Sequence, residues 1–206
     1  IRERSANAET ARKEIGALWA SAQTVTGPVL NVPGTRVVSN DGTFVTTTMH
    51  LLPDELKVNG VLEPEMRYRG IYETVVYDSD MEISGSFTIA GFEQLNDFTW
   101  EWDKAYISLG VSDNKGISDK AELTIGEKVI GAIPGAGTTD LFDKGISFPY
   151  PVDPAKISEA GGAFSIKLSL RGSGSVAFSP VGRTTEVALS SKWDAPSFTG
   201  NFLPAE

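Results

Sequence analysis

The side chain best suited to acid–base chemistry near neutral pH is His50, the one histidine among 206 residues. A neutral imidazole can take a proton from a serine hydroxyl in a Ser-His-Asp triad, whose members come together from distant sequence positions. However, no Gly-x-Ser-x-Gly motif marks a nucleophilic serine. His50 lies in an alternating segment, residues 43–51. We therefore interpret it as a histidine on the face or edge of a β-sheet, and we assign no catalytic residue.

Neither a metal site nor a cofactor site is expected. The chain has no cysteine, and catalytic zinc is usually held by two or more histidines. Asp113-Asn114-Lys115-Gly116 resembles part of a calcium loop, but Lys115 stands where an oxygen ligand belongs. The glycine-rich stretch 131–137 lacks the Gly-Lys-Ser/Thr ending of a phosphate-binding loop.

Two pairs of carboxylates are spaced closely enough to act together: Asp78 with Asp80, and Glu101 with Asp103. A glycoside hydrolase uses two carboxyl groups at a set separation, which a sequence alone does not give. In an acidic protein such pairs are common on the surface. We interpret Asp78 and Asp80 as solvated acids that flank a turn.

Trp100 and Trp102 are the most suggestive binding residues. Strand alternation places both indoles on one face and Glu101 and Asp103 on the other. Aromatic faces beside carboxylates can hold sugars or cations. The same pattern also describes a strand packed against a core, which we favour. A module that binds carbohydrate or peptidoglycan fragments is the alternative function.

Composition limits the classes of partner. The net charge of −9 argues against nucleic acid, because binding phosphates requires clustered Lys and Arg. No run of 18 apolar residues is present. The chain starts at Ile1 without a methionine and ends shortly after Phe202-Leu203-Pro204. We therefore expect it to be part of a longer protein whose membrane segments lie outside these 206 residues.

The elements that must position these side chains are mainly strands. One amphipathic helix is expected at about residues 6–22, because apolar residues recur there with a period of 3.6. After Pro28 the period becomes two, most clearly in residues 164–171. Residues 126–162 are expected to wrap the sheets or form a rim. Further strands are predicted at 29–32, 43–51, 56–62, 71–77, 81–89, 106–111, 121–125, 175–178 and 185–189. The prediction is a single mainly β domain over residues 1–206, an antiparallel β-sandwich or a large curved sheet with one N-terminal α-helix.

Several phrases, in order along the chain, resemble the CreD family of inner membrane proteins. The helix and the segment after it carry the first phrase, and residues 170–204 carry the most specific ones. The matching phrases lie at residues 2–4, 11–15, 19, 23–30, 52–56, 67–72, 76–77, 84–87, 111–113, 170–173, 178–185, 190–193 and 196–204. Residues 127–161 match no phrase of the family.

The resemblance implies a parent protein with one N-terminal membrane helix, a large periplasmic domain and several C-terminal membrane helices. This chain would be the periplasmic domain. The family is associated with the Cre regulon, cell-envelope integrity, stress response and tolerance of E-type colicins, and it brings no catalytic residues. The implied partners are the parent's own transmembrane helices or another envelope protein. The net charge disfavours direct attraction to anionic lipid.

Two features of the family phrases suggest physical roles. Arg67 and Arg69 share one strand face, while Tyr68 and Tyr72 occupy the other. We interpret them as a salt-bridged surface over packed tyrosines, with a binding surface (Arg67, Arg69, Tyr72) as the sharper alternative. The glycines of these phrases are expected at turns or bulges, at positions 70, 85, 172, 182 and 200. The favoured function is a non-enzymatic periplasmic domain. A hydrolase built on His50 or a carboxylate pair is the remaining rival.

Overall fold

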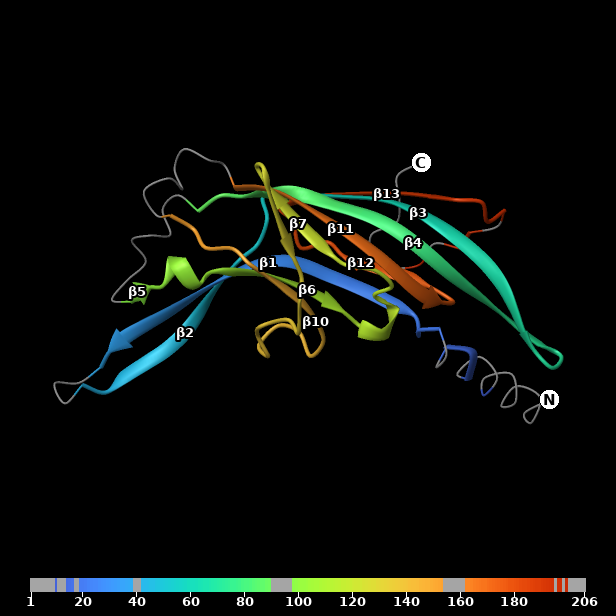
Figure 1. Cartoon of the computed structure of the whole chain (residues 1–206), viewed down its shortest axis with the longest axis horizontal. Helices are drawn as coiled ribbons and strands as arrows, with labels where there is room; N and C mark the ends of the chain where they lie inside the picture. Colours follow the sequence, from blue (N-terminus) through green and yellow to red (C-terminus); the bar gives the residue numbers. More distant parts are fainter. Residues whose placement is uncertain are drawn as a thin grey trace.

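Two twisted β-sheets lie face to face and enclose one hydrophobic core (Figure 1). The computed structural model describes residues 10, 14–16, 19–38, 42–89, 98–153, 162–194, 196–197 and 199. The prediction of a mainly β fold with a short N-terminal helical segment is confirmed.

The first sheet is built around one long strand, β1. Its order is β12-β1-β6-β10-β9, and β2 and β5 also pair with β1. The strands are β1 (Gln23–Val37), β2 (Phe44–Leu51), β5 (Thr99–Trp100), β6 (Tyr106–Val111), β9 (Ile133–Pro134), β10 (Gly145–Pro149) and β12 (Val176–Ser179). Because β1 is longer than its neighbours, its second half continues beyond the sandwich and pairs with β2 as a protruding hairpin (Figure 1).

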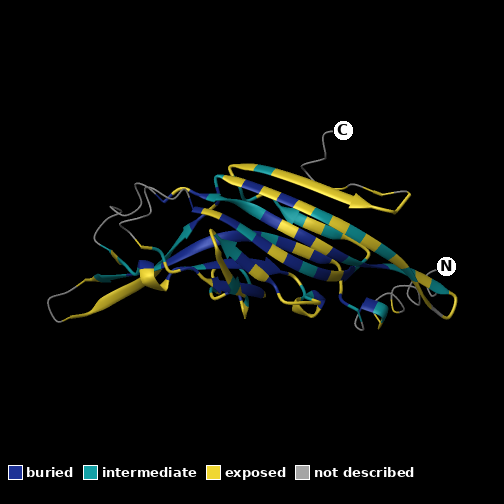
Figure 2. Cartoon of the chain, turned by 45° about the horizontal axis from the view of Figure 1, so that its top comes forward, coloured by how far each residue is buried: buried dark blue, intermediate teal, exposed yellow. Residues whose placement is uncertain are grey.

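The second sheet has the order β13-β3-β4-β11-β7-β8. Its strands are β3 (Glu55–Arg69), β4 (Tyr72–Phe87), β7 (Glu122–Ile125), β8 (Lys128–Gly131), β11 (Gly162–Ser173) and β13 (Thr184–Ser191). Alternation explains its two faces: in β11, Phe164, Ile166, Leu168 and Leu170 are buried while the residues between them face outward (Figure 2). The β3–β4 hairpin also extends past the core.

Three local predictions need correction. The helix was expected to reach Ala22, but Ser21 and Ala22 are not helical, because Ser21 instead bonds Asp113 through its N–H and hydroxyl. The alternation of apolar and polar or small residues at 106–111 would place one face of β6 in water, yet all of Ile107–Val111 is buried. Its outer face is covered by residues 132–142, which belong to the stretch expected to be irregular. That stretch also contains β8, β9 and β10.

Two short 3-10 turns complete the fold, η1 (Trp102–Lys104) and η2 (Asn114–Gly116). The alternation predicted for Trp100 to Asp103 is wrong, because β5 ends at Trp100 and the chain turns into η1. Within the described ranges, no helix is long and apolar enough to cross a bilayer.

Candidate functional site

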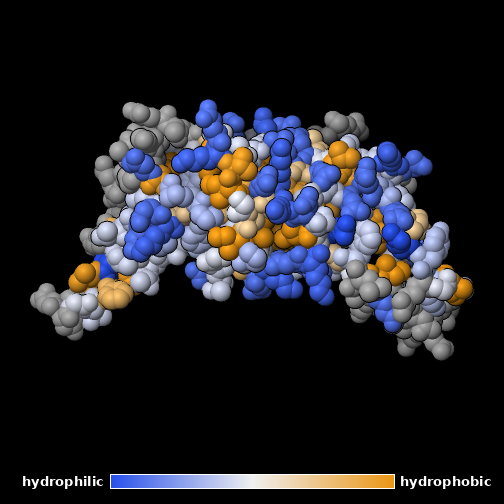
Figure 3. Space-filling model, viewed as in Figure 1, coloured by the Kyte–Doolittle hydropathy of each residue, from blue (hydrophilic) through white to orange (hydrophobic). Residues whose placement is uncertain are grey.

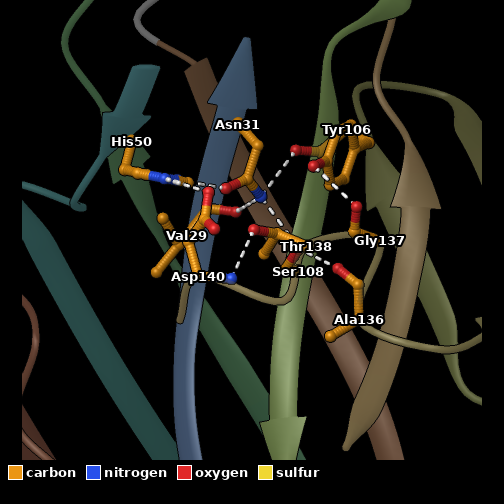
Figure 4. Close-up of polar contacts among 9 residues, drawn as sticks. All are labelled: Val29, Asn31, His50, Tyr106, Ser108, Ala136, Gly137, Thr138 and Asp140. Atoms are coloured by element: carbon orange, nitrogen blue, oxygen red, sulfur yellow. Dashed lines mark hydrogen bonds and ion pairs between the residues drawn. The ribbon is translucent and has the colours of Figure 1, made fainter. Parts of the chain in front are cut away.

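A buried polar network lies between the middle of β1 and the loop that covers β6 (Figure 4). Its centre is Asn31, which is fully buried in an otherwise apolar part of β1. The register places Asn31 opposite His50 of β2 on one side and Tyr106 of β6 on the other. Its Nδ2 donates to the carbonyl oxygens of Val29 at 3.0 Å and Tyr106 at 3.3 Å, and to Ser108 Oγ at 2.8 Å.

These contacts fix the tautomer of His50. Because Nδ2 of Asn31 faces three acceptors, its Oδ1 must be the atom that accepts from His50 Nδ1, at 2.7 Å. His50 therefore carries a hydrogen on Nδ1. Its Nε2 points toward Asp140 Oδ2, 3.9 Å away, and the side chain is 25% exposed against 68% for Asp140.

The loop over β6 is held by the same network. Ser108 Oγ donates to the carbonyl of Ala136, and Tyr106 Oη donates to the carbonyl of Gly137 at 3.0 Å. Burial, with the nearby Asp140 carboxylate as a second cause, raises the pKa of Tyr106, so its hydroxyl stays a donor at neutral pH. Gly137 has φ +75° and no space for a Cβ beside the Tyr106 ring.

The arrangement of these side chains favours a structural role, in which they hold the loop in place. It does not favour nucleophilic catalysis. Ser108 is fully buried and donates its proton to a carbonyl, whereas a nucleophilic serine must donate to its base. The amide of Asn31 separates the Ser108 hydroxyl from the His50 imidazole. Sequence reasoning missed Asn31, although a single asparagine within Val29-Leu30-Asn31-Val32 was a signal for a buried polar contact.

Three of the four paired carboxylates, those of Asp78, Asp80 and Glu101, make short contacts. Asp78 and Asp80 lie in the middle of β4 and do not flank a turn, so that detail of the prediction is wrong. Asp78 accepts from Arg171 Nε at 2.8 Å, and Asp80 accepts from Ser169 Oγ at 2.6 Å, across to β11. Glu101 pairs with Lys104 at 2.8 Å. Among the described residues, no group of three His, Asp or Glu side chains is arranged to hold a metal ion.

The indoles of Trp100 and Trp102 pack inward. Trp102 is buried in the core, and Trp100 is half-buried and packs against the core. The Trp100 ring stacks on Phe98, with 5.5 Å between centroids, and fills the space beside Gly34. Neither ring lies as an open platform of the kind on which a sugar stacks.

Arg67 takes part in a contact inside the chain. Trp19, just after the helical segment, lies between two guanidinium groups: Arg67 at 5.1 Å and Arg171 at 5.2 Å from the ring. Trp19 Nε1 also donates to the carbonyl of Tyr77. Arg67 and Glu65 form an ion pair at 2.8 Å, with the Arg67 side chain 45% exposed. The N-terminal segment is thereby fixed to the second sheet.

The other two predicted surface residues lie at the end of the same hairpin. Tyr72 is half-buried and stands opposite Arg69 in the register of β3 and β4. The side chain of Arg69 lies outside the described residues. The structure therefore brings Arg67 to Trp19, and it places Tyr72 farther out along the hairpin.

Comparison with known proteins identifies the family of this chain. The profile of the family described as "Inner membrane protein CreD" matches residues 1–206. The chain belongs to the CreD family. Inner membrane protein CreD of Escherichia coli (strain K12) is 29% identical to it over 190 residues. Those residues are 89% of this chain and 42% of the relative, so the chain spans about two fifths of that protein's length. No solved structure matches it.

Two of the segments that resemble the CreD family, residues 52–56 and 178–185, meet in space. Asp54 accepts from the backbone N–H of Thr88 at 2.9 Å and pairs with Arg183 at 2.9 Å, which joins the starts of β3 and β13. Gly182 allows a close approach, since a Cβ there would lie 2.7 Å from Leu56 Cβ. Gly85 and Gly172 likewise sit against neighbouring groups, so the prediction that they occupy turns or bulges is wrong. Gly70 does occupy a turn, with φ +61°, and Gly200 lies outside the described residues.

Asp54 predicts an acid-dependent loss of stability. Hydrogen bonds from Thr88 are the largest cause of its lowered pKa, and Arg183 adds to them. A carboxylate whose folded pKa lies below its unfolded value stabilises the fold above the unfolded pKa, and this contribution is lost as pH falls through the folded pKa. We expect Asp54→Asn to lower the urea midpoint at pH 6, and the difference from wild type to shrink at pH 3. The exposed Asp103→Asn is the matched control, with little change at either pH.

Proposed function

We propose that this chain is the periplasm-facing domain of a CreD-type inner membrane protein and that it supports envelope integrity without catalysis. The observation that carries the proposal is the family match over residues 1–206. The engaged polar groups agree with it. His50, both indoles and the carboxylates Asp78, Asp80 and Glu101 make contacts within the fold, which supports a structural role for them. Tolerance of E-type colicins is the proposed phenotype of the parent protein.

The orientation is tested by cysteine labelling in intact cells. The chain has no cysteine, so one introduced thiol in a full-length parent cleared of its other cysteines reports on this domain alone. Glu127→Cys is exposed in the turn between β7 and β8, and Ala121→Cys is buried. A membrane-impermeant maleimide should label Glu127→Cys in intact cells, and Ala121→Cys only after denaturation. Labelling of Glu127→Cys that requires broken cells would place the domain in the cytoplasm and refute the proposal.

The absence of catalysis is tested at His50. In His50→Gln, the side-chain amide can still donate to Asn31 Oδ1, but it cannot act as an acid or a base near neutral pH. We expect cells that carry this variant of the full-length protein to keep wild-type colicin tolerance. Loss of tolerance, with the protein present at its normal level and its thermal midpoint unchanged, would indicate acid–base chemistry at His50.

A further inference from the structure

Near its end, the β1–β2 hairpin carries exposed apolar side chains on both of its faces. Val37 is 70% exposed and stands directly opposite Phe44, which is 64% exposed. On the other face, Val45 is 43% exposed and stands opposite Arg36. Val38, at the end of the strand, is exposed as well. A two-stranded ribbon with apolar groups on both faces cannot bury them against one flat partner.

The β3–β4 hairpin ends in the same way at the other end of the molecule. Tyr68 is 69% exposed near the end of β3, and Ile71 is 79% exposed in the turn. Gly70, with φ +61°, makes the turn that presents Ile71. Tyrosine and isoleucine at the tip of an isolated ribbon gain nothing from packing within the fold.

Both tips lie on the same side of the molecule. Figure 1 shows the two hairpins leaving opposite ends of the sandwich and pointing downward, with the loop beside β10 between them. Figure 3 shows apolar atoms at both lower corners. The β3–β4 hairpin is also the one that contacts Trp19, just after the N-terminal helical segment, through Arg67.

We propose that the ends of the two hairpins dip into the interface of a lipid bilayer, with Phe44 and Ile71 as the two contact points. This proposal rests on the proposed function, in which the chain is part of an inner membrane protein. A fluid lipid interface can surround the end of a hairpin and cover both of its faces. A flat protein surface can cover only one face. Tyrosine favours the headgroup level, which fits Tyr68 just above Ile71. With a net charge of −9, the attraction comes from apolar burial and not from anionic lipid.

The test uses the cysteine-free chain with a single environment-sensitive fluorophore. Phe44→Cys and Ile71→Cys report on the two tips, and Val129→Cys on β8 and Val187→Cys on β13 are matched exposed controls. Each labelled chain is tethered by an N-terminal hexahistidine tag to vesicles of phosphatidylethanolamine and phosphatidylglycerol that contain a small share of nickel-chelating lipid. We expect a blue shift at positions 44 and 71, and quenching there by spin-labelled acyl chains. The controls should behave as in water, and added salt should leave the shift unchanged.

A double variant tests how much the two side chains contribute to the affinity for vesicles. Phe44→Ser/Ile71→Ser should bind untethered vesicles at least about tenfold more weakly than wild type, because each apolar side chain loses its burial. Val129→Ser/Val187→Ser should bind as wild type. If the fluorophores at positions 44 and 71 emit as in water when the chain is on the vesicle, the proposal is overturned. A blue shift without vesicles that grows with protein concentration would also overturn it, in favour of a second copy of this chain as the occupant. Labelling of Glu127→Cys in cells tests the proposed function separately, because tip insertion says nothing about which side of the membrane the domain faces.

Discussion

Replacing Asn31 with leucine should lower the free energy of unfolding by about 2–4 kcal/mol. Leucine has the branching of asparagine but is larger, so the loss comes from missing hydrogen bonds and from overpacking at a fully buried position, and not from a cavity. The carbonyls of Val29 and Tyr106 lose a donor, and His50 Nδ1 loses its acceptor, around a side-chain position that is itself fully buried. Urea denaturation should show a lower midpoint with an unchanged slope.

Asn59→Leu is the matched control for this variant. Asn59 lies on the exposed face of β3, where an amide can exchange protein partners for water. Its replacement should change stability by no more than about 0.5 kcal/mol. If Asn31→Leu changes the free energy of unfolding as little as Asn59→Leu does, the network around Asn31 does not hold β1, β2 and the loop over β6 together. A loss confined to Asn31 would assign the network a structural task.

Much of the fold could be predicted from the sequence, because the second sheet follows simple alternation. Residues 164–171 have one face on the core and one in water, and β11 has that pattern in the structure. The first sheet was harder. Strand β6 has both faces covered, so its alternation does not report burial. Strands β8 to β10 contain glycine and proline, which suggested an irregular stretch between residues 126 and 162.

The candidate site was predicted only in its parts. His50 was correctly placed on a strand of a sheet, but its partner Asn31 comes from β1 and the covering loop from residues 136–140. Such contacts depend on the register between strands, which a single sequence does not specify. Trp100 and Trp102 were expected on one strand, yet Trp100 ends β5 and Trp102 begins the 3-10 turn η1. A local turn of this kind carries no periodic signal.

Gly85→Ala should destabilise the fold more than any other single methyl addition on the second sheet. An added Cβ would lie 2.0 Å from the carbonyl oxygen of Glu55 and 2.9 Å from Phe164 Cζ. The first contact is with backbone, which cannot rotate away as a side chain can. β3 must move away from β4 to relieve the first contact, and the Phe164 ring must shift from its contact with Phe87 to relieve the second. We expect a loss of about 3 kcal/mol or more in the free energy of unfolding.

Gly131→Ala is the matched control for Gly85→Ala, because it adds the same methyl group to a strand without steric conflict. No atom lies within 4 Å of the added Cβ, and Gly131 does not have a positive φ. Alanine restricts the unfolded chain more than glycine does, so this variant should be neutral or more stable by up to about 1 kcal/mol. Equal midpoints for Gly85→Ala and Gly131→Ala in thermal and urea denaturation would contradict the close approach of β3 to β4. A difference of several kcal/mol would show that the Ser84-Gly85-Ser86-Phe87 phrase shared with the CreD family is needed to let Glu55 pack against β4.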